Sequence, residues 1–228
     1  MPASFGYILN TRPFRDTSYL VDIFSEDHGR ICCIARPAKK RGKIVKGNLQ
    51  PFRYHHLQWI GKGEVQTLTE VDERGRHSIP AAELMLGIYL NELLLLLTRQ
   101  HVPMPELFSA YKYTLHKLVD PLINQQILMR FEMYLLAHLG YPLEIQAEAE
   151  ILPEMRYRLT QDNGLISSSN EEISSALHQQ TITGELLLAL EDLAAMEASH
   201  WKQLREYLDA TLQSLAPRPL NARKLLSL

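Results

Sequence analysis

The residues of this 228-residue chain best suited to chemistry are cations gathered in one short segment. Between His28 and Gly63 there are nine Lys and Arg residues and no Asp or Glu, and six of the nine fall between Arg36 and Lys46. Adjacent ammonium and guanidinium groups repel one another and resist burial, so the block predicts a solvated loop. Because no carboxylates alternate with the cations, we favour contact with a polyanion over the alternative of a merely soluble loop.

Motifs that would indicate an enzyme are missing from the sequence. It has no GxxxxGK[ST] phosphate loop, no GxGxxG after a strand, no GxSxG elbow and no HExxH pair. Zinc needs about four converging ligands, and the only conceivable set is Cys32-Cys33 with His55-His56, whose neighbouring side chains alternate between strand faces. We therefore expect no enzyme, no catalytic residue, no metal and no cofactor.

The segments that must position the cations are rich in Ile, Val, Tyr, Phe and Thr and are separated by turn residues, which predicts short strands. Five strands in so short a region favour a small closed barrel, because closure removes exposed edges. We expect a barrel of the oligonucleotide-binding (OB) type, although an SH3-like barrel has a similar strand count. The five predicted strands are residues 5–10, 18–25, 30–35, 52–60 and 64–71.

After Pro80 the apolar residues recur with helical spacing. A hairpin-like patch, residues 156–159 and 165–168 around Asp162-Asn163-Gly164, interrupts this pattern. We nevertheless predict the α+β class, with the barrel in residues 1–80 and an all-helical C-terminal domain in residues 81–228. The predicted helices are residues 82–99, 105–119, 121–138 with Gly140 as a stop, 171–178, 183–196 with Thr183 as N-cap, and 199–215.

The two parts differ in charge. Residues 1–80 contain 13 Lys and Arg against 8 Asp and Glu, a net of +5, whereas the whole chain has a net charge of −2. This asymmetry places the expected polyanion-binding surface on the barrel. The two cysteines are neighbours, the start of the chain lacks the pattern of a signal peptide, and no apolar run is long enough to span a bilayer. We expect a cytoplasmic protein without membrane contact.

Several strings carry a resemblance to a known family through their order and spacing. They are TSYLVDIFS at 17–25 with HGR at 28–30, KGNLQPF at 46–52, GEVQTL at 63–68, YLNEL at 89–93, RFE at 130–132 and LGY at 139–141. On these strings the chain resembles the RecO family of bacterial recombination mediators over essentially its whole length. Many members carry a four-cysteine zinc module in the second domain. Residues 81–228 contain no cysteine, so zinc is not carried over.

The resemblance implies a non-enzymatic function. It implies an OB barrel that binds single- and double-stranded DNA, and partnership with RecR and with single-stranded DNA-binding protein. It also implies annealing of complementary strands and help in loading RecA onto coated strands, neither of which needs a phosphate loop. An OB-fold RNA-binding protein is the alternative, because a cationic barrel binds RNA as readily as DNA.

The expected DNA-binding residues are cations of the barrel and its loop, with aromatic side chains that stack on bases or belong to the core. The basic residues Arg218, Arg223 and Lys224 near the C-terminus would extend the DNA path or belong to a frayed end. The cations are Arg12, Arg15, Arg30, Arg36, Lys39, Lys40, Arg41, Lys43 and Lys46, and the aromatic candidates are Phe14, Tyr19, Phe52, Tyr54 and Trp59.

The expected protein-binding residue is Arg130, the only Lys or Arg between Lys117 and Arg156. In the RecO family, the partner is the acidic C-terminal tail of single-stranded DNA-binding protein, which ends in a free carboxylate. Such a tail needs an apolar groove with a cation at its rim. By resemblance we expect Arg130 to contact the carboxylate beside Phe131 and Leu135; the alternative is a surface arginine paired with a nearby acid.

Overall fold

The computed structural model describes residues 1–37, 44–120, 124–143, 150–160, 164–168, 181–224 and 226. Its chain forms two compact units, one of Met1–Asn124 with Leu220–Leu228 and one of Gln125–Pro219. The boundary that we expected at residue 80 stays a prediction.

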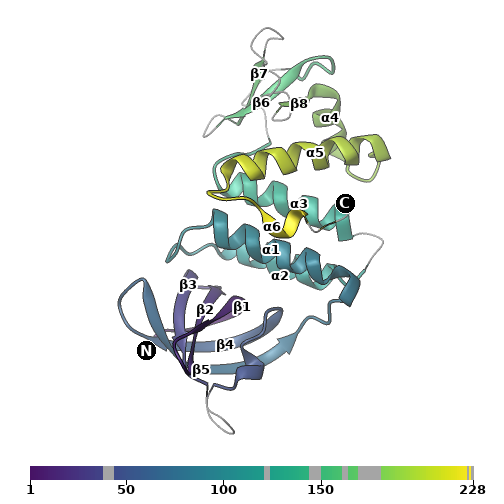
Figure 1. Ribbon diagram of the computed structural model, residues 1–228. Coiled ribbons are helices and arrows are strands. Elements are labelled where there is room, and N and C mark those ends of the chain that lie inside the picture. Colours follow the sequence, from purple (N-terminus) through teal and green to yellow (C-terminus); the bar gives the residue numbers. More distant parts are fainter. Residues whose placement is uncertain are drawn as a thin grey trace. The chain divides into compact units, whose positions relative to one another are not determined.

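Five strands form a closed barrel in the first unit, as predicted (Figure 1). Around the barrel the order is β1-β2-β3-β5-β4; β3 and β5 run parallel and the other described pairs run antiparallel. The first and last strands are longer than their apolar patterns indicated. The strands are β1 (Ala3–Phe14), β2 (Ser18–Ser25), β3 (Gly29–Ala35), β4 (Arg53–Ile60) and β5 (Val65–Arg76).

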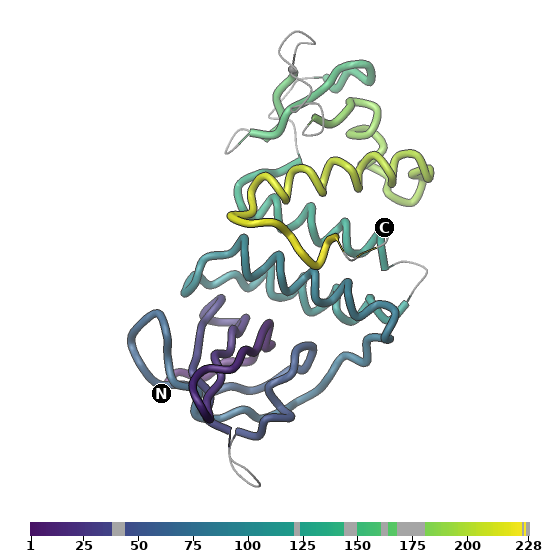
Figure 2. Tube along the Cα trace, viewed as in Figure 1, coloured from purple at the N-terminus to yellow at the C-terminus, as the bar shows by residue number. Residues whose placement is uncertain are grey.

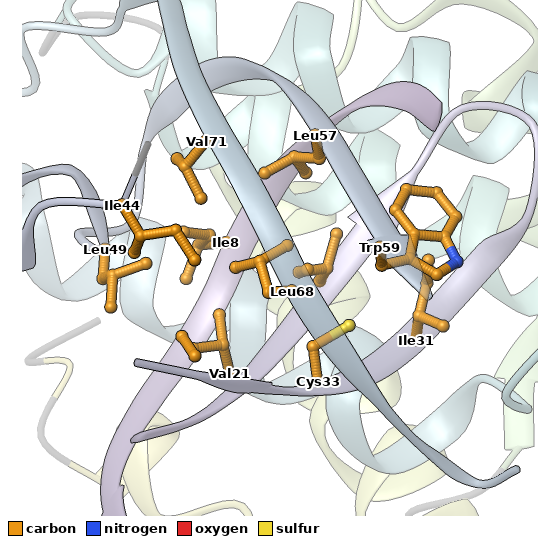
Figure 3. Close-up of a cluster of buried hydrophobic side chains, with 12 residues drawn as sticks. Ile8, Val21, Ile31, Cys33, Ile44, Leu49, Leu57, Trp59, Leu68 and Val71 are labelled. Atoms are coloured by element: carbon orange, nitrogen blue, oxygen red, sulfur yellow. The ribbon is translucent and has the colours of Figure 1, made fainter. Parts of the chain in front are cut away.

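The interior of the barrel is filled by alternate side chains of its strands, as the period of a half-buried strand requires (Figure 3). In β4, for example, Leu57 and Trp59 lie in the barrel core. Ile44 and Leu49 also belong to this cluster, although they precede β4. The end of the expected basic loop is therefore anchored in the core on both sides of the short helix η1 (Lys46–Asn48).

Helices cover the outer face of the barrel within the same unit. The rings of Tyr7 in β1 and Phe24 in β2 pack against Phe108 and Tyr111. The Tyr111 hydroxyl donates to Asn91 Oδ1 at 2.6 Å, and Asn91 Nδ2 donates to the Leu9 carbonyl oxygen at 2.8 Å. This chain of hydrogen bonds explains an asparagine in a leucine-rich helix. The helices are η2 (Ala81–Glu83), α1 (Leu84–Leu97) and α2 (Pro105–Lys117).

The helix α6 (Asn221–Lys224) belongs to the first unit although it lies near the end of the chain. It lies beside α1 (Figure 1 and Figure 2). The backbone N–H groups of Asn221 and Ala222 donate to the two Glu92 carboxylate oxygens at 3.0 and 2.8 Å. Residues 221–224 are thus anchored, and the alternative of a frayed end is wrong for them.

The second unit combines helices with a three-stranded sheet of order β7-β6-β8. The predicted hairpin is confirmed as β6 and β7, but the expectation of an all-helical C-terminal domain is wrong. Backbone pairing of Arg156 with Thr183 adds β8, a strand of three residues that no sequence pattern separates from the next helix. The elements are α3 (Asn124–His138), β6 (Arg156–Thr160), β7 (Gly164–Ser168), β8 (Thr181–Thr183), α4 (Gly184–Ala189), η4 (Leu190–Asp192) and α5 (Ala198–Leu215).

Two helix boundaries in this region match their sequence signals. Thr183 is the N-cap of α4, and its side chain accepts a hydrogen bond from the Leu186 backbone N–H at 3.2 Å. Gly140 has a φ of +88° just after α3, where glycine is favoured. The predicted helix at 171–178 lies outside the described residues. Among the described helices, none combines the length and apolarity needed to cross a membrane.

Candidate nucleic-acid interface

The turn between β1 and β2 brings a cation and an aromatic ring to one end of the barrel. Phe14 and Ser18 form the last pair of the hairpin, and Arg15 takes a positive φ of 55° in the turn. The Arg15 side chain is exposed, and its guanidinium carbon lies 5.2 Å from the centroid of the Phe14 ring. A cation and a partly exposed ring therefore share the tip of this hairpin.

A second ring lies at the start of β2, and two more cations lie after β3 and at the start of η1. Tyr19 pairs with Pro13 of β1 and Ala35 of β3, and Lys46 Nζ lies 5.4 Å from the centroid of its ring. Arg36 follows Ala35 directly, and both Arg36 and Lys46 are exposed. We call the set Phe14, Arg15, Tyr19, Arg36 and Lys46 the cationic tip. Two rings with cations over them can offer stacking and phosphate contacts together.

The other predicted cations are distributed differently. Arg12 is exposed on β1 opposite Leu20, two residues before Phe14. The candidates in residues 38–43 lie outside the described residues, so their roles stay predictions. The described residues end at Pro37, next to Arg36, and resume at Ile44, two residues before Lys46. These remaining candidates are Lys39, Lys40, Arg41 and Lys43.

Arg30 has a structural contact that sequence reasoning missed. Its Nη2 donates to the carbonyl oxygen of Thr98 at 2.9 Å, and its own carbonyl oxygen accepts from the His101 backbone N–H at 2.9 Å. Burial lowers the pKa of the guanidinium, an effect that the nearby Asp22 carboxylate opposes. Arg30 therefore joins β3 to the segment after α1, and a DNA contact by Arg30 stays a prediction.

Two of the five aromatic candidates are not available to bases. Trp59 and Phe52 have only 2% and 6% of their surface exposed, so of the two alternatives left by the sequence they belong to the core. Tyr54 is half-buried and stacks on Phe5, with ring centroids 5.3 Å apart and planes inclined by 13°. Sequence reasoning missed Phe5, because a single aromatic at the start of a strand carries no signal of its partner.

The cysteines and histidines do not form the conceivable zinc set. Cys33 is fully buried in the barrel core, and burial raises the pKa of its thiol to about 12. His55 is also fully buried, whereas His56 is half-buried and packs edge-on against Phe5. Within the residues that the structure describes, no group of three His, Cys, Asp or Glu side chains suits a metal ion.

In the second unit, Arg130 is exposed on α3, but Phe131 and Leu135 are only 2% and 0% exposed. These two apolar residues are buried and line no open groove in the part of the chain that the structure describes, and their contact with the tail stays a prediction. The exposed neighbour one turn from Arg130 is Tyr134, which is 42% exposed. The contact of Arg130 with the tail stays a prediction.

A buried ion pair next to Arg130 also escaped sequence reasoning. Glu132 is fully buried, and its carboxylate accepts two hydrogen bonds from Arg205 at 2.6 and 2.9 Å. Arg205 Nη2 also lies 2.6 Å from Asp209 Oδ1, one turn away on α5. This network links α3 to α5 inside the second unit.

Together these features define an α+β class of protein, in which a closed five-stranded barrel with a cationic tip precedes helices and a small sheet. The family model described as "Recombination protein O N terminal" matches residues 3–74, and the one described as "Recombination protein O C terminal" matches residues 82–224. The chain belongs to the RecO family, which confirms the resemblance seen in the sequence strings.

Similar proteins match most of the chain. One named DNA repair protein RecO, from Coxiella burnetii, is 32% identical over 227 residues that cover 97% of this chain and 96% of its own. A protein of the same name from Chromobacterium violaceum is 35% identical over 190 residues, 82% of this chain and 78% of its own. Another from Actinobacillus pleuropneumoniae is 32% identical over 228 residues, with coverages of 96% and 92%.

Proposed function

We propose that this protein is a DNA repair and recombination mediator. It binds single- and double-stranded DNA, anneals complementary strands and helps to load RecA on strands coated by single-stranded DNA-binding protein. The observation that carries the proposal is the match of both family models to almost the whole chain, together with relatives named DNA repair proteins. The function is non-enzymatic, so it assigns no catalytic residue and no cofactor.

The barrel is of the OB type in this proposal. The closed order β1-β2-β3-β5-β4, with a single described parallel pair between β3 and β5, supports this assignment over an SH3-like barrel. OB barrels bind oligonucleotides on the face of strands 2 and 3 and on the loop between strands 1 and 2. The cationic tip includes that loop, the start of β2 and the residue after β3.

The DNA path follows the exposed cations of this end of the barrel. Phosphates contact the cations, while Phe14 and Tyr19 offer ring faces to bases. Arg30 remains a candidate, but its hydrogen bond to Thr98 favours a structural role. The proposed phosphate contacts are Arg12, Arg15, Arg36, Lys39, Lys40, Arg41, Lys43 and Lys46.

The helical part is the proposed site of protein partners. Exposed Arg130 receives the terminal carboxylate of the acidic tail of single-stranded DNA-binding protein. Buried Phe131 and Leu135 hold the helix that presents it. RecR is a second partner and RecA an indirect one. Residues 81–228 contain no cysteine, which supports a member of the family without the zinc module. The protein acts in the cytoplasm, at the nucleoid.

A salt titration of oligonucleotide binding tests the proposal. Each phosphate contact to a single strand contributes about −0.7 to the slope of log affinity against log salt, so simultaneous contact by about six of the eight proposed cations predicts a slope near −4. DNA and RNA oligonucleotides of the same sequence are compared. Absence of salt-dependent DNA binding would contradict the proposal, and a clear preference for RNA would favour an RNA-binding protein.

A further inference from the structure

The outer face of β1 and β4 carries a row of aromatic side chains that the cationic tip does not include. Backbone pairing sets Phe5 opposite His56 and Tyr7 opposite Tyr54. Residues two apart on a strand share a face, so these four rings lie on the same side of the sheet. His55, between two of them, is fully buried on the other side.

The rings form a supported stack. Tyr7 is fully buried, and its ring centroid lies 5.3 Å from that of Tyr54. Tyr54 in turn stacks nearly parallel on Phe5, with centroids 5.3 Å apart. Phe5, at the outer end, is 39% exposed. A large ring that is fixed by packing and still open to solvent can receive a base at little entropic cost.

Helix α2 adds one cation to this stack and carries a second cation–ring pair of its own. Lys112 is exposed, and its Nζ lies 4.1 Å from the centroid of the Tyr54 ring. One residue further, Tyr113 is 55% exposed, and Lys117 Nζ lies 5.6 Å from its ring centroid. Ammonium groups over exposed rings are the combination with which proteins bind a base and its phosphate.

The acids around the stack indicate which ligand it suits. Glu26 and Asp27 lie near the Phe5 end: the Glu26 backbone N–H donates to the Phe5 carbonyl oxygen at 2.9 Å, and Asp27 accepts from the Ser4 hydroxyl at 2.7 Å. Burial, and after it these two carboxylates, raise the pKa of Tyr54, which keeps its phenol neutral. Carboxylates at this end repel any anion, so a base can stack on Phe5 only if its phosphate lies away from them, on the side of Lys112.

Further cations and acids border the stack on β4 and β5. Arg53 and Arg76 both pair with Glu73 at 2.6 Å, which leaves one net positive charge in that group. Arg74 and Asp72 pair with each other at 2.6 Å. Lys112 is thus the cation that a phosphate next to a stacked base can reach without breaking an ion pair among these residues.

We propose that Phe5, Tyr54 and Lys112 form a second contact for single-stranded nucleic acid, with a base on Phe5 and its phosphate at Lys112. The proposal rests on the DNA-binding function proposed above and adds a site to it. Phe5 precedes Phe14 of the cationic tip by nine residues of β1, which corresponds to roughly 30 Å of extended strand. One bound strand can therefore contact both sites only if it runs along the barrel.

The test measures the affinity of the full chain for a single-stranded oligothymidylate at several salt concentrations. Phe5→Leu removes the ring and is expected to weaken binding about fivefold or more without changing the salt slope. Phe5→Tyr keeps the ring and is expected to retain affinity. Lys112→Gln is expected to flatten the slope by about 0.7, whereas Lys202→Gln, a control at an exposed lysine of the other unit, leaves it unchanged.

Crosslinking locates the contact directly. An oligonucleotide with 5-iodouracil is irradiated with the protein, and mass spectrometry is expected to find the crosslink at Phe5 or Tyr54. If Phe5→Leu binds like the wild type and no crosslink forms there, the second contact is overturned. Equal loss in Phe5→Leu and Phe5→Tyr would also overturn it, because the ring alone would not account for binding.

The two proposals fail in different ways. If the wild type binds no oligonucleotide, the proposed function fails and the second contact falls with it. If cationic-tip variants lose affinity but Phe5→Leu does not, only the second contact fails. Loss of RecR binding in Phe5→Leu, with unchanged oligonucleotide binding, would identify the stack as a protein-docking surface instead.

Discussion

Arg30 donates a hydrogen bond from Nη2 to the carbonyl oxygen of Thr98 at 2.9 Å and so joins strand β3 to the end of helix α1. The last carbonyls of a helix have no partner within it, and a cation at that end also complements the helix dipole. A residue that the charge pattern groups with the DNA-binding cations therefore has a stabilising role in the first unit.

Arg30→Gln and Arg36→Gln form a matched pair of neutralising variants that separates stability from DNA binding. Arg30→Gln is expected to lower the free energy of unfolding by about 1.5–3 kcal/mol, the usual contribution of a hydrogen bond to a charged group, and to leave the salt slope of binding unchanged. Exposed Arg36→Gln is expected to leave stability within about 0.5 kcal/mol and to flatten the slope. Urea unfolding and oligonucleotide titrations measure the two effects, and the reverse pattern would contradict these roles.

Neutralising the described cations of the tip together is expected to weaken DNA binding mainly at low salt. Each lost phosphate contact on a single strand removes about 0.7 from the slope, so the triple variant Arg15→Gln, Arg36→Gln, Lys46→Gln should flatten it by about 2. Anisotropy titrations at several salt concentrations measure the slope. A slope equal to that of the wild type would move the DNA path away from the tip.

The stability of the protein is expected to fall as the pH falls from about 7 toward 5. Burial lowers the pKa of His55 inside the barrel, more than the nearby Glu73 carboxylate raises it. The pKa of His77 is lowered as well, first by burial. Histidine in the unfolded chain has a pKa of about 6.5, so below that pH the unfolded chain binds protons that the folded chain does not. Each of the two groups then lowers the free energy of unfolding by up to about 1.4 kcal/mol per pH unit.

The variant His55→Leu identifies the group responsible for this dependence. It is expected to reduce the pH dependence of the unfolding free energy between pH 7 and 5, and His77 accounts for a remainder. Above pH 7 both imidazoles are neutral in the folded and in the unfolded chain. Their protonation therefore no longer lowers the free energy of unfolding. Denaturant unfolding at fixed pH values measures the effect, and an undiminished slope in His55→Leu would contradict the assignment.

Breaking the buried ion pair of the second unit is expected to be costly. Glu132→Gln removes the buried negative charge that faces Arg205 and should lower the free energy of unfolding by about 3 kcal/mol or more. An apolar double variant, Glu132→Leu with Arg205→Met, removes both buried charges and should be less destabilised than either single variant. If the double variant is destabilised as much as the single variants or more, the loss of stability does not come from an unpaired buried charge.

Local sequence patterns predicted the parts of the fold that depend on neighbouring residues. Runs rich in β-branched and aromatic residues, separated by turn residues, predicted the five barrel strands, and the Asp162-Asn163-Gly164 signal predicted the hairpin of β6 and β7. Strand β8 escaped prediction because Thr181–Thr183 is too short to show alternation, and Thr183 also carries a valid N-cap signal.

The errors at the candidate sites come from contacts between distant residues. Glu132 and Arg205 are 73 residues apart, so no local pattern announces their ion pair. The assignment of Phe131 and Leu135 to an open groove required knowing which face of α3 is covered. Arg30 was grouped with the loop cations by its charge, but the position of Thr98 determines its contact. The stack of Phe5 on Tyr54 depends on the pairing of β1 with β4.

The most direct test of the mediator function is annealing of complementary DNA strands that are already coated with single-stranded DNA-binding protein, without any nucleotide. The wild type is expected to accelerate annealing of both coated and bare strands. Arg130→Ala should lose the acceleration only on coated strands, because the proposed tail contact is needed there alone. No acceleration on coated strands by the wild type, with oligonucleotide binding intact, would contradict the mediator function.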